Sequence, residues 1–214
     1  MNNNNQNIPK VSKRNLPLLV LIIIIFIFLS GSTVAYLFTT ASNTIFTGNL
    51  SNVDLSLNVT KVLPNTNGMD DIFVIGFDEL ASSINADCYD DGYTLCQIYK
   101  ITLSNSANGI NTDVRGRLSF DNENAPNLSW LYLGNSFSTS TTYTSAMLGN
   151  SFNTASSTFT NFIDSYLINA GTSKDFYVVV WVNESEVEQN DEGVFTATVR
   201  FDDSNGKGVT ATFS

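Results

Sequence analysis

The 214-residue sequence contains no histidine. This absence excludes a Ser-His-Asp triad, a Cys-His dyad, an H-E-x-x-H zinc site and an imidazole general base. Charged residues make up only 14% of the chain, a low share for a soluble protein. No pair of carboxylates stands out as catalytic either. The sequence therefore predicts a protein that is not an enzyme and that requires no cofactor.

Basic residues are also few, and they are unevenly placed. The chain has 10 basic and 20 acidic residues. The first three basic residues (Lys10, Lys13 and Arg14) come before an apolar run, and all of the acidic residues come after it. The part after the run thus carries 7 basic and 20 acidic side chains, a formal charge of −13. Such a field repels nucleic acids and anionic lipid head groups, so we expect no nucleic-acid partner.

The apolar run itself, residues 16–29, reads LPLLVLIIIIFIFL without interruption. A basic stretch, an apolar stretch of this length and then small residues are typical of a secretory signal, here with cleavage between Ala35 and Tyr36. The alternative is an uncleaved anchor, because residues 16–38 are long enough to cross a membrane as a helix. The basic residues would then stay inside. Both interpretations place the acidic part outside the cell, at its surface.

Three regions follow from this division: a signal peptide or membrane anchor over 1–35, an N-terminal extension over 36–50, and a folded domain over 51–214. In the folded domain, short alternating or apolar runs are separated by Asn, Gly, Asp and Ser, the pattern of β-strands and turns. The predicted strands cover residues 52–63, 71–77, 93–103, 111–120, 176–182, 194–201 and 208–213. Together they predict an all-β protein, an antiparallel β-sandwich of jelly-roll type.

Individual side chains in these strands have expected positions. Residues 176–182 (FYVVVWV) are apolar on both faces, as in a central strand that is covered on both sides. Trp130 and Trp181 lie in strand-like contexts and are predicted to be core residues. Arg115 and Arg117 alternate with apolar residues and are expected to point towards solvent.

One segment departs from the strand pattern. Residues 157–171 read STFTNFIDSYLINAG, with apolar residues at i, i+3, i+4, i+7 and i+8. These residues are Phe159, Phe162, Ile163, Tyr166 and Leu167. The spacing predicts a short amphipathic helix that ends before Gly171 and closes one end of the sandwich.

The two cysteines, Cys88 and Cys96, lie in the segment CYDDGYTLC. The DDG sequence between them predicts a turn, and the residues after it predict a strand. In an exported chain with two cysteines, we expect a structural disulfide that contributes about 2–3 kcal/mol.

Acidic residues cluster at several predicted turns. Asp87, Asp90 and Asp91 are the best candidates for a calcium site, because calcium binds carboxylate oxygens in turns and a disulfide would hold these three together. The alternative is a solvated turn. The remaining clusters, including Asp202 and Asp203, are interpreted as solvated turns.

Two stretches of the sequence resemble the TasA/camelysin family. The first, STVAYLFTTASNTIFTGNLSNVDLSL, has matching positions at Ala35, Asn43, Phe46, Gly48, Asp54 and Leu55. The second, FYVVVWVNESEVEQNDEGVFTATVRF, has matching positions at Trp181, Gln189, Asn190, Phe195 and Phe201. Two features depart from the family: the spacing between Phe46 and Gly48 is one residue shorter, and the cysteine pair is an addition.

The resemblance implies a jelly-roll subunit of an extracellular filament or biofilm matrix fibre, in which each subunit donates its N-terminal segment to the sheet of the next. The chain's main partner would then be itself. Residues 36–47 (YLFTTASNTIFT) would be the donor strand, because they are strand-prone, uncharged and free of proline. The apolar residues of this segment are Tyr36, Leu37, Phe38, Ile45 and Phe46. A flexible tether is the alternative role, and it would make the protein a membrane-tethered monomeric adhesin.

Overall fold

The computed structural model describes residues 46–47, 54–65, 72–121, 127–184 and 195–214. The chain divides into two compact units, Met1–Ala41 and Ser42–Ser214, and all described residues belong to the second. The predicted signal or anchor, the Ala35–Tyr36 junction and donor residues 36–45 (Leu37, Phe38 and Ile45 among them) lie outside the described residues. None of the helices within the described ranges is long and apolar enough to span a membrane.

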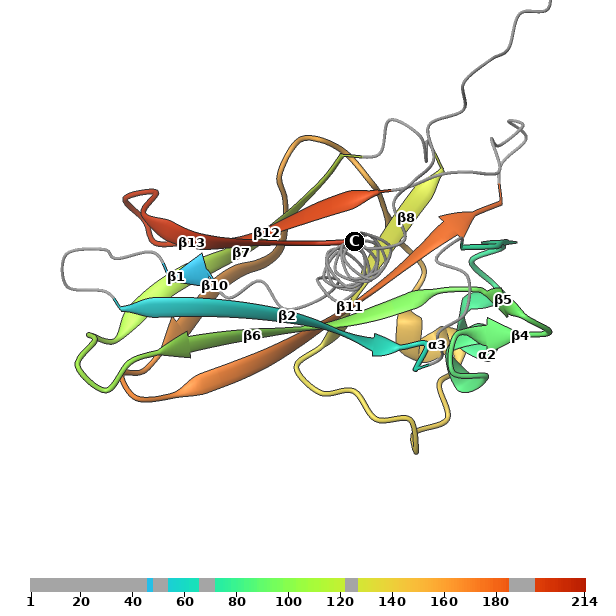
Figure 1. Cartoon of the computed structure of the whole chain (residues 1–214), viewed down its shortest axis with the longest axis horizontal. Coiled ribbons are helices and arrows are strands. Elements are labelled where there is room, and N and C mark those ends of the chain that lie inside the picture. The colour runs from blue at the N-terminus through green and yellow to red at the C-terminus, as the bar shows by residue number, and fades with distance from the viewer. Residues whose placement is uncertain (1–45, 48–53, 66–71, 122–126, 185–194) are drawn as a thin grey trace, which may run out of the picture. The chain divides into compact units, whose positions relative to one another are not determined.

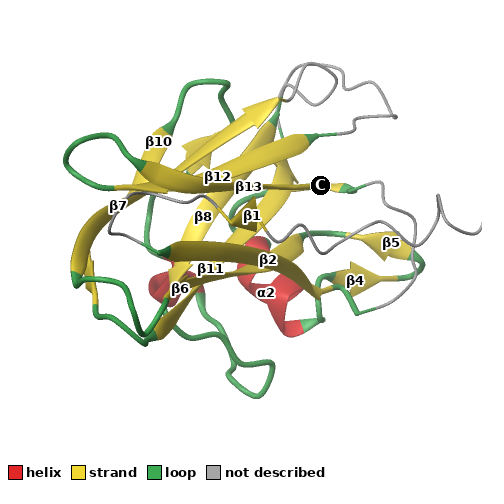
Figure 2. Ribbon diagram, turned by 60° about the vertical axis from the view of Figure 1, so that its left-hand side comes forward, coloured by secondary structure: helices red, strands yellow, loops and turns green. Residues whose placement is uncertain are grey.

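The described chain forms a sandwich of antiparallel sheets, as the strand pattern predicted (Figures 1 and 2). The larger sheet has the order β1 (Phe46–Thr47), β2 (Leu55–Leu63), β6 (Gln97–Asn105), β11 (Ser173–Asn183), β8 (Leu128–Gly134) and β9 (Asn153–Thr154), and β3 (Val74–Ile75) pairs in parallel with the end of β11. The smaller sheet has the order β10 (Thr160–Ile168), β7 (Thr112–Asp121), β12 (Thr196–Asp202) and β13 (Gly208–Phe213). A separate hairpin joins β4 (Tyr89–Asp90) to β5 (Tyr93–Thr94), and the helices are α2 (Leu80–Asn85) and α3 (Ser145–Leu148).

The main core lies between the two sheets and is filled by the alternating apolar residues of each strand. Trp130 of β8 is buried there, which confirms its predicted place. Gly116 of β7 leaves space for two rings: a Cβ at this position would lie 2.8 Å from Phe162 and 2.9 Å from Phe201. The small residue is therefore required by close packing in the centre of the sandwich.

Strand β11 is covered on both sides, as its sequence predicted. Val178 and Val180 face the main core, whereas Val179 and Trp181 belong to a second apolar cluster on the opposite face of the larger sheet. Residues of α2, both cysteines and the segment that follows β8 cover this second cluster. The molecule thus has two apolar layers, one on each face of the larger sheet.

The predicted helix over residues 157–171 is wrong, because residues 160–168 form strand β10. This strand pairs with β7, and its register shifts between Asn161 and Ile163 and again between Ile163 and Tyr166. Each irregularity changes the face of the sheet to which the following side chains point. Phe162, Ile163 and Tyr166 can therefore all pack against the core despite their helix-like spacing. The helices that do form, α2 and α3, lie in segments without that pattern.

Candidate functional site

Strands β2 and β13 both contact β1, the described end of the predicted donor segment. β13 is the edge strand of the smaller sheet, and β2 is next to the edge of the larger sheet; the two strands run side by side without pairing to each other. Figures 1 and 2 both show the short strand β1 between them. We call the line along which β2 and β13 adjoin the seam.

The seam has an apolar floor. Leu57 and Val59 of β2 are buried beneath it, as are Val209 and Ala211 of β13. At the end of β13, the ring of Phe213 packs 4.3 Å from the ring of Tyr99, a residue of the larger sheet. Alternate side chains of a strand that enters the seam would therefore meet an apolar surface on one face.

Strand β1 occupies part of this seam. It pairs with β2 in antiparallel register, Phe46 opposite Leu57 and Thr47 opposite Ser56. β1 contains the last two residues of the predicted donor segment, so the described end of that segment forms an edge strand. Residues 58–60 of β2 have no strand neighbour on this side within the described chain.

A second feature lies beside the seam, on the outer face of the smaller sheet. Asp202 of β12 is buried, with 1% of its side chain exposed, and its Oδ2 is surrounded by three arginines. The distances are 2.6 Å to Arg117, 3.4 Å to Arg115 and 3.9 Å to Arg200. We call these four residues the arginine cluster. The interpretation of Asp202 as part of a solvated turn is therefore wrong. Arg115 and Arg117 lie on the outer face of the sheet, as predicted, with 42% and 22% of their side chains exposed, and they pair with Asp202 there.

The neighbouring Asp203 organises the turn between β12 and β13. Its carboxylate accepts hydrogen bonds from the backbone N–H groups of Asn205 and Lys207, both at 2.9 Å. Burial raises the pKa of Asp203, but the hydrogen bonds from Lys207 and Asn205 outweigh it and hold the pKa below its ordinary value. This turn fixes the end of β12 and, with it, the cluster.

The hairpin β4–β5 carries the predicted disulfide. Cys88 and Cys96 are bonded and fully buried, which confirms the prediction, with their Cα atoms 4.8 Å apart. Asp87, Asp90 and Asp91 are exposed on this hairpin. Among the described residues, no group of three or more His, Cys, Asp or Glu side chains is placed to hold a metal ion, so the calcium site stays a prediction.

Two exposed aromatic side chains lie on the same hairpin and beside it. Phe73 and Tyr93 are 54% and 51% exposed, and their rings are 5.4 Å apart. The backbone N–H of Phe73 donates a 2.6 Å hydrogen bond to the carbonyl of Thr94 in β5, which holds the two segments together. An acidic and aromatic surface thus surrounds the tip of a hairpin that the disulfide stabilises.

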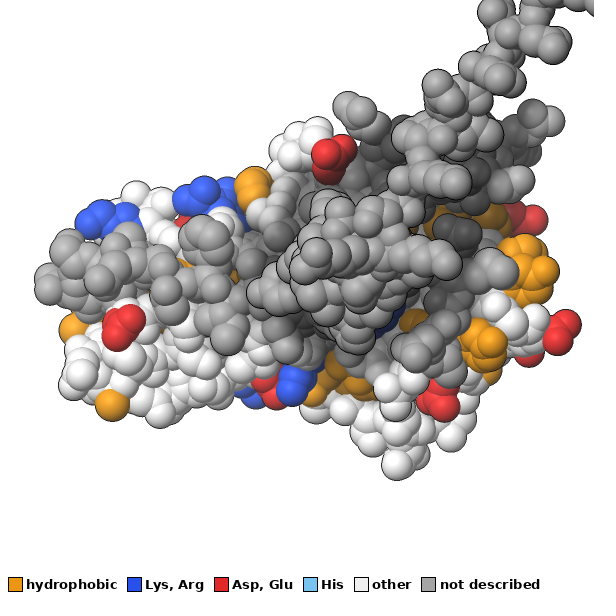
Figure 3. All heavy atoms as spheres, in the orientation of Figure 1, with side chains coloured by type: hydrophobic (Ala, Val, Ile, Leu, Met, Phe, Trp, Pro, Cys, Tyr) orange, Lys and Arg blue, Asp and Glu red, His pale blue; other side chains and the backbone are white. Residues whose placement is uncertain are grey.

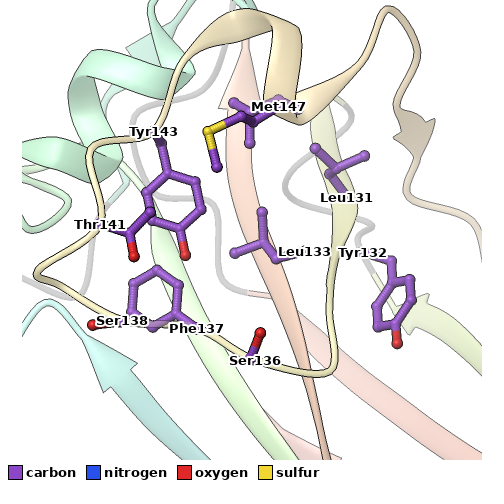
Figure 4. A pocket seen from close by; sticks show the side chains of 10 residues that line it. Leu131, Tyr132, Leu133, Ser136, Phe137, Ser138, Thr141, Tyr143 and Met147 are labelled. Carbon is purple, nitrogen blue, oxygen red and sulfur yellow. The ribbon is translucent and has the colours of Figure 1, made fainter.

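A shallow cavity of about 290 Å³ lies on the outer face of the larger sheet, between β8 and the segment that contains α3 (Figure 4). Its wall is apolar at Leu131 and Leu133, and the stacked rings of Phe137 and Tyr143 lie 5.5 Å apart beside it. Figure 4 shows that Tyr132 points away from this cavity. The cavity contains no titratable pair or nucleophile arrangement that indicates chemistry.

Tyr132 instead faces the main core, where its ring packs 5.5 Å from Phe162. Its hydroxyl donates a hydrogen bond to Oδ1 of Asn135. Burial, with a smaller contribution from the charge of Tyr166, raises the pKa of Tyr132 to about 12.

Sequence reasoning missed the arginine cluster. The alternation of β12 places Arg200 and Asp202 on one face, but the register that sets Arg117 opposite Arg200 and Arg115 opposite Asp202 joins segments more than 80 residues apart. The excess of arginine over lysine in these two strands was the available signal, because arginine is preferred in buried ion pairs.

Comparison with known proteins identifies no family. No family model matches the chain, and no curated protein matches it. Similar solved structures include the PA14 domain of the MpAFP antifreeze protein, which is 9% identical, with 81% of each chain covered and a TM-score of 0.29. A similarity this distant carries no argument about function.

Proposed function

We propose that this protein is exported and serves as a structural subunit of an extracellular fibre, in which the segment 36–47 of one copy adds as a strand to the seam of the next. The observation that carries the proposal is β1: the end of this segment already pairs with β2, beside the edge of β13. An open sheet edge offers unpaired N–H and C=O groups to another strand.

Two further features support the proposal. The apolar floor of the seam would bury alternate side chains of an incoming strand, and Tyr36, Phe38 and Phe46 would share one face of the donor segment in a strand. Its length of 12 residues also exceeds the 9 residues of β2, so the segment is long enough to pair along that strand.

Export is supported by the apolar run at 16–29 and by the disulfide. Disulfides persist in oxidising compartments and are rare in the cytosol. The Cys88–Cys96 bond is therefore expected in a protein that acts outside the cell.

The test is the assembly of the chain that begins at Tyr36, followed by electron microscopy and sedimentation. Proline at Thr39 or at Thr40 removes one backbone N–H group. Adjacent N–H groups of a strand point in opposite directions, so one of the two variants removes an N–H that would donate a hydrogen bond to the strand edge of the next copy. We expect fibres from the unmodified chain, and we expect at least one proline variant to lose them.

Alanine at the same two positions is the matched control and should leave assembly intact. If the unmodified chain stays monomeric at high concentration, strand donation is wrong. The membrane-tethered adhesin then becomes the better interpretation, and intact protein from cells should retain residues 1–35.

A further inference from the structure

Positive charge is concentrated at one place in the exported part of the chain. Arg115, Arg117 and Arg200 project from the outer face of the smaller sheet, and Lys207 follows in the turn after β12, where the carbonyl of Gly206 accepts a 2.7 Å hydrogen bond from Arg200. Figure 3 shows basic side chains over the β12–β13 end of the molecule, at the upper left. These are four of the 7 basic residues after position 36.

Asp202 neutralises this charge only in part. Its single carboxylate faces three guanidinium groups, and its Oδ1 has no hydrogen-bond partner. Arg117 and Arg200 lie directly opposite each other on adjacent strands, an unfavourable arrangement for like charges. The next carboxylate along β7, Asp113, accepts a 2.7 Å hydrogen bond from Ser165. The cluster therefore has the charge to bind a further carboxylate, and guanidinium groups bind carboxylates through charge-assisted hydrogen bonds.

A carboxylate surface of matching character exists on the same chain. The tip of the β4–β5 hairpin exposes Asp90 and Asp91, with the exposed rings of Phe73 and Tyr93 beside them. Arginine binds carboxylates and also stacks on aromatic rings, and Arg117 already lies 5.4 Å from the ring centre of Phe159. The disulfide fixes the hairpin in advance, which lowers the entropy lost on binding.

The two surfaces lie at different ends of the folded unit. In Figure 1 the β4–β5 hairpin is at the right and the β12–β13 turn is at the left. One copy therefore cannot close this contact on itself, whereas a second copy can.

We propose that the arginine cluster binds the acidic, aromatic tip of the disulfide hairpin of a second copy of this chain. The contact joins two different surfaces of identical subunits, so it is repeated from copy to copy, and it extends a fibre wherever the repeat does not close into a ring. This inference rests on the proposed function. It adds an electrostatic contact, next to the seam, that selects the correct neighbour and accelerates its approach.

Site-directed cross-linking tests the contact directly. Both native cysteines are bonded to each other, so an introduced cysteine is a free thiol. We would mix a chain carrying Asp91→Cys with a chain carrying Lys207→Cys and treat the mixture with a short bismaleimide. The matched control replaces Asp91→Cys with Asp121→Cys, an exposed aspartate at the far end of β7 from Arg115.

At low ionic strength, we expect the 91–207 cross-link to form at least about tenfold more efficiently than the 121–207 cross-link, and to weaken strongly in about 0.5 M salt. Asp91→Lys or Lys207→Glu should each reduce self-association about tenfold, and the double variant should restore it. The hydrogen bonds of Lys207 within its turn involve its backbone N–H and carbonyl, so its variant keeps them even if arginine variants disturb the sheet; the charge of Lys207 also helps to lower the pKa of Asp203.

The outcomes separate this inference from the proposed function. Fibres without the preferential 91–207 cross-link would overturn the inference and leave strand donation standing. A salt-sensitive 91–207 cross-link without fibres would support the inference and refute strand donation. If inorganic phosphate binds the cluster tightly and no cross-link forms, the cluster is an anion site and the inference is wrong.

Discussion

Replacing Asp202 with asparagine should destabilise the sandwich substantially. The change is nearly isosteric, so it creates no cavity, but it removes the carboxylate that faces Arg115, Arg117 and Arg200. Arg117 and Arg200 lie directly opposite each other in the register of β7 and β12. Without the carboxylate, they repel each other and lose their shortest ion pair, at 2.6 Å.

The magnitude follows from burial. Removing one partner of a fully buried ion pair costs about 3–5 kcal/mol. Here the carboxylate is 1% exposed, but the arginine side chains are 22–42% exposed and can turn to water. We therefore expect a loss of about 2–3 kcal/mol. For a domain of this size, that loss lowers the melting temperature by roughly 5–10 °C.

Urea denaturation of the two proteins measures this loss. The matched control is Asp121→Asn, an exposed carboxylate on the neighbouring strand, which should change stability by less than about 0.5 kcal/mol. About 0.5 M salt should recover part of the loss, because it screens the repulsion between arginines. An Asp202→Asn variant as stable as its control would refute the electrostatic role assigned to the buried carboxylate.

Three further changes have predicted results. Stability should fall as the pH rises from about 10 towards about 12, the pKa of Tyr132, because partial burial of this side chain favours its neutral form; Tyr132→Phe should remove this contribution together with the part of the tyrosinate absorbance that appears near pH 12. Alanine at both Cys88 and Cys96 should cost about 2–3 kcal/mol in urea denaturation, and an unchanged midpoint would contradict the structural role of the disulfide. Gly116→Ala should cost about 1–3 kcal/mol, because its Cβ would overlap the rings that meet there; a thermal melt with no loss would show that these rings adjust freely.

Most strands could be predicted from the sequence because their burial follows a period of two. Strand β12 shows this directly, with Ala197, Val199 and Phe201 buried and Thr196 exposed. Strand β11 broke the alternation for the predicted reason, since it is covered on both faces. Where local periodicity and local burial agree, one sequence is sufficient to place a strand.

The segment 157–171 shows where such reasoning fails. Its two register shifts change the face of successive side chains, and the resulting apolar spacing imitates a helix. The shifts arise from pairing with β7, a strand distant in the sequence, so local pattern does not contain them.

The candidate sites divide in the same way. The disulfide could be predicted because Cys88 and Cys96 are the chain's two cysteines and flank a turn. The seam and the arginine cluster could not, because both depend on how distant strands meet. Arg117 reaches Asp202 only through the β7–β12 register, and β13 meets β2 only when the two sheets pack.

Strand donation between copies is tested most directly by isotope-mixed cross-linking inside fibres. Chains that begin at Tyr36 and carry both Thr40→Cys and Thr212→Cys would be prepared with light and with heavy nitrogen, mixed in equal amounts, assembled and oxidised. Thr212 is exposed on β13, at the seam. Strand donation predicts linked 40–212 peptides in which mixed-label pairs are as abundant as both same-label pairs together. Linked peptides of the same label alone would show that the segment folds onto its own chain, and would contradict strand donation.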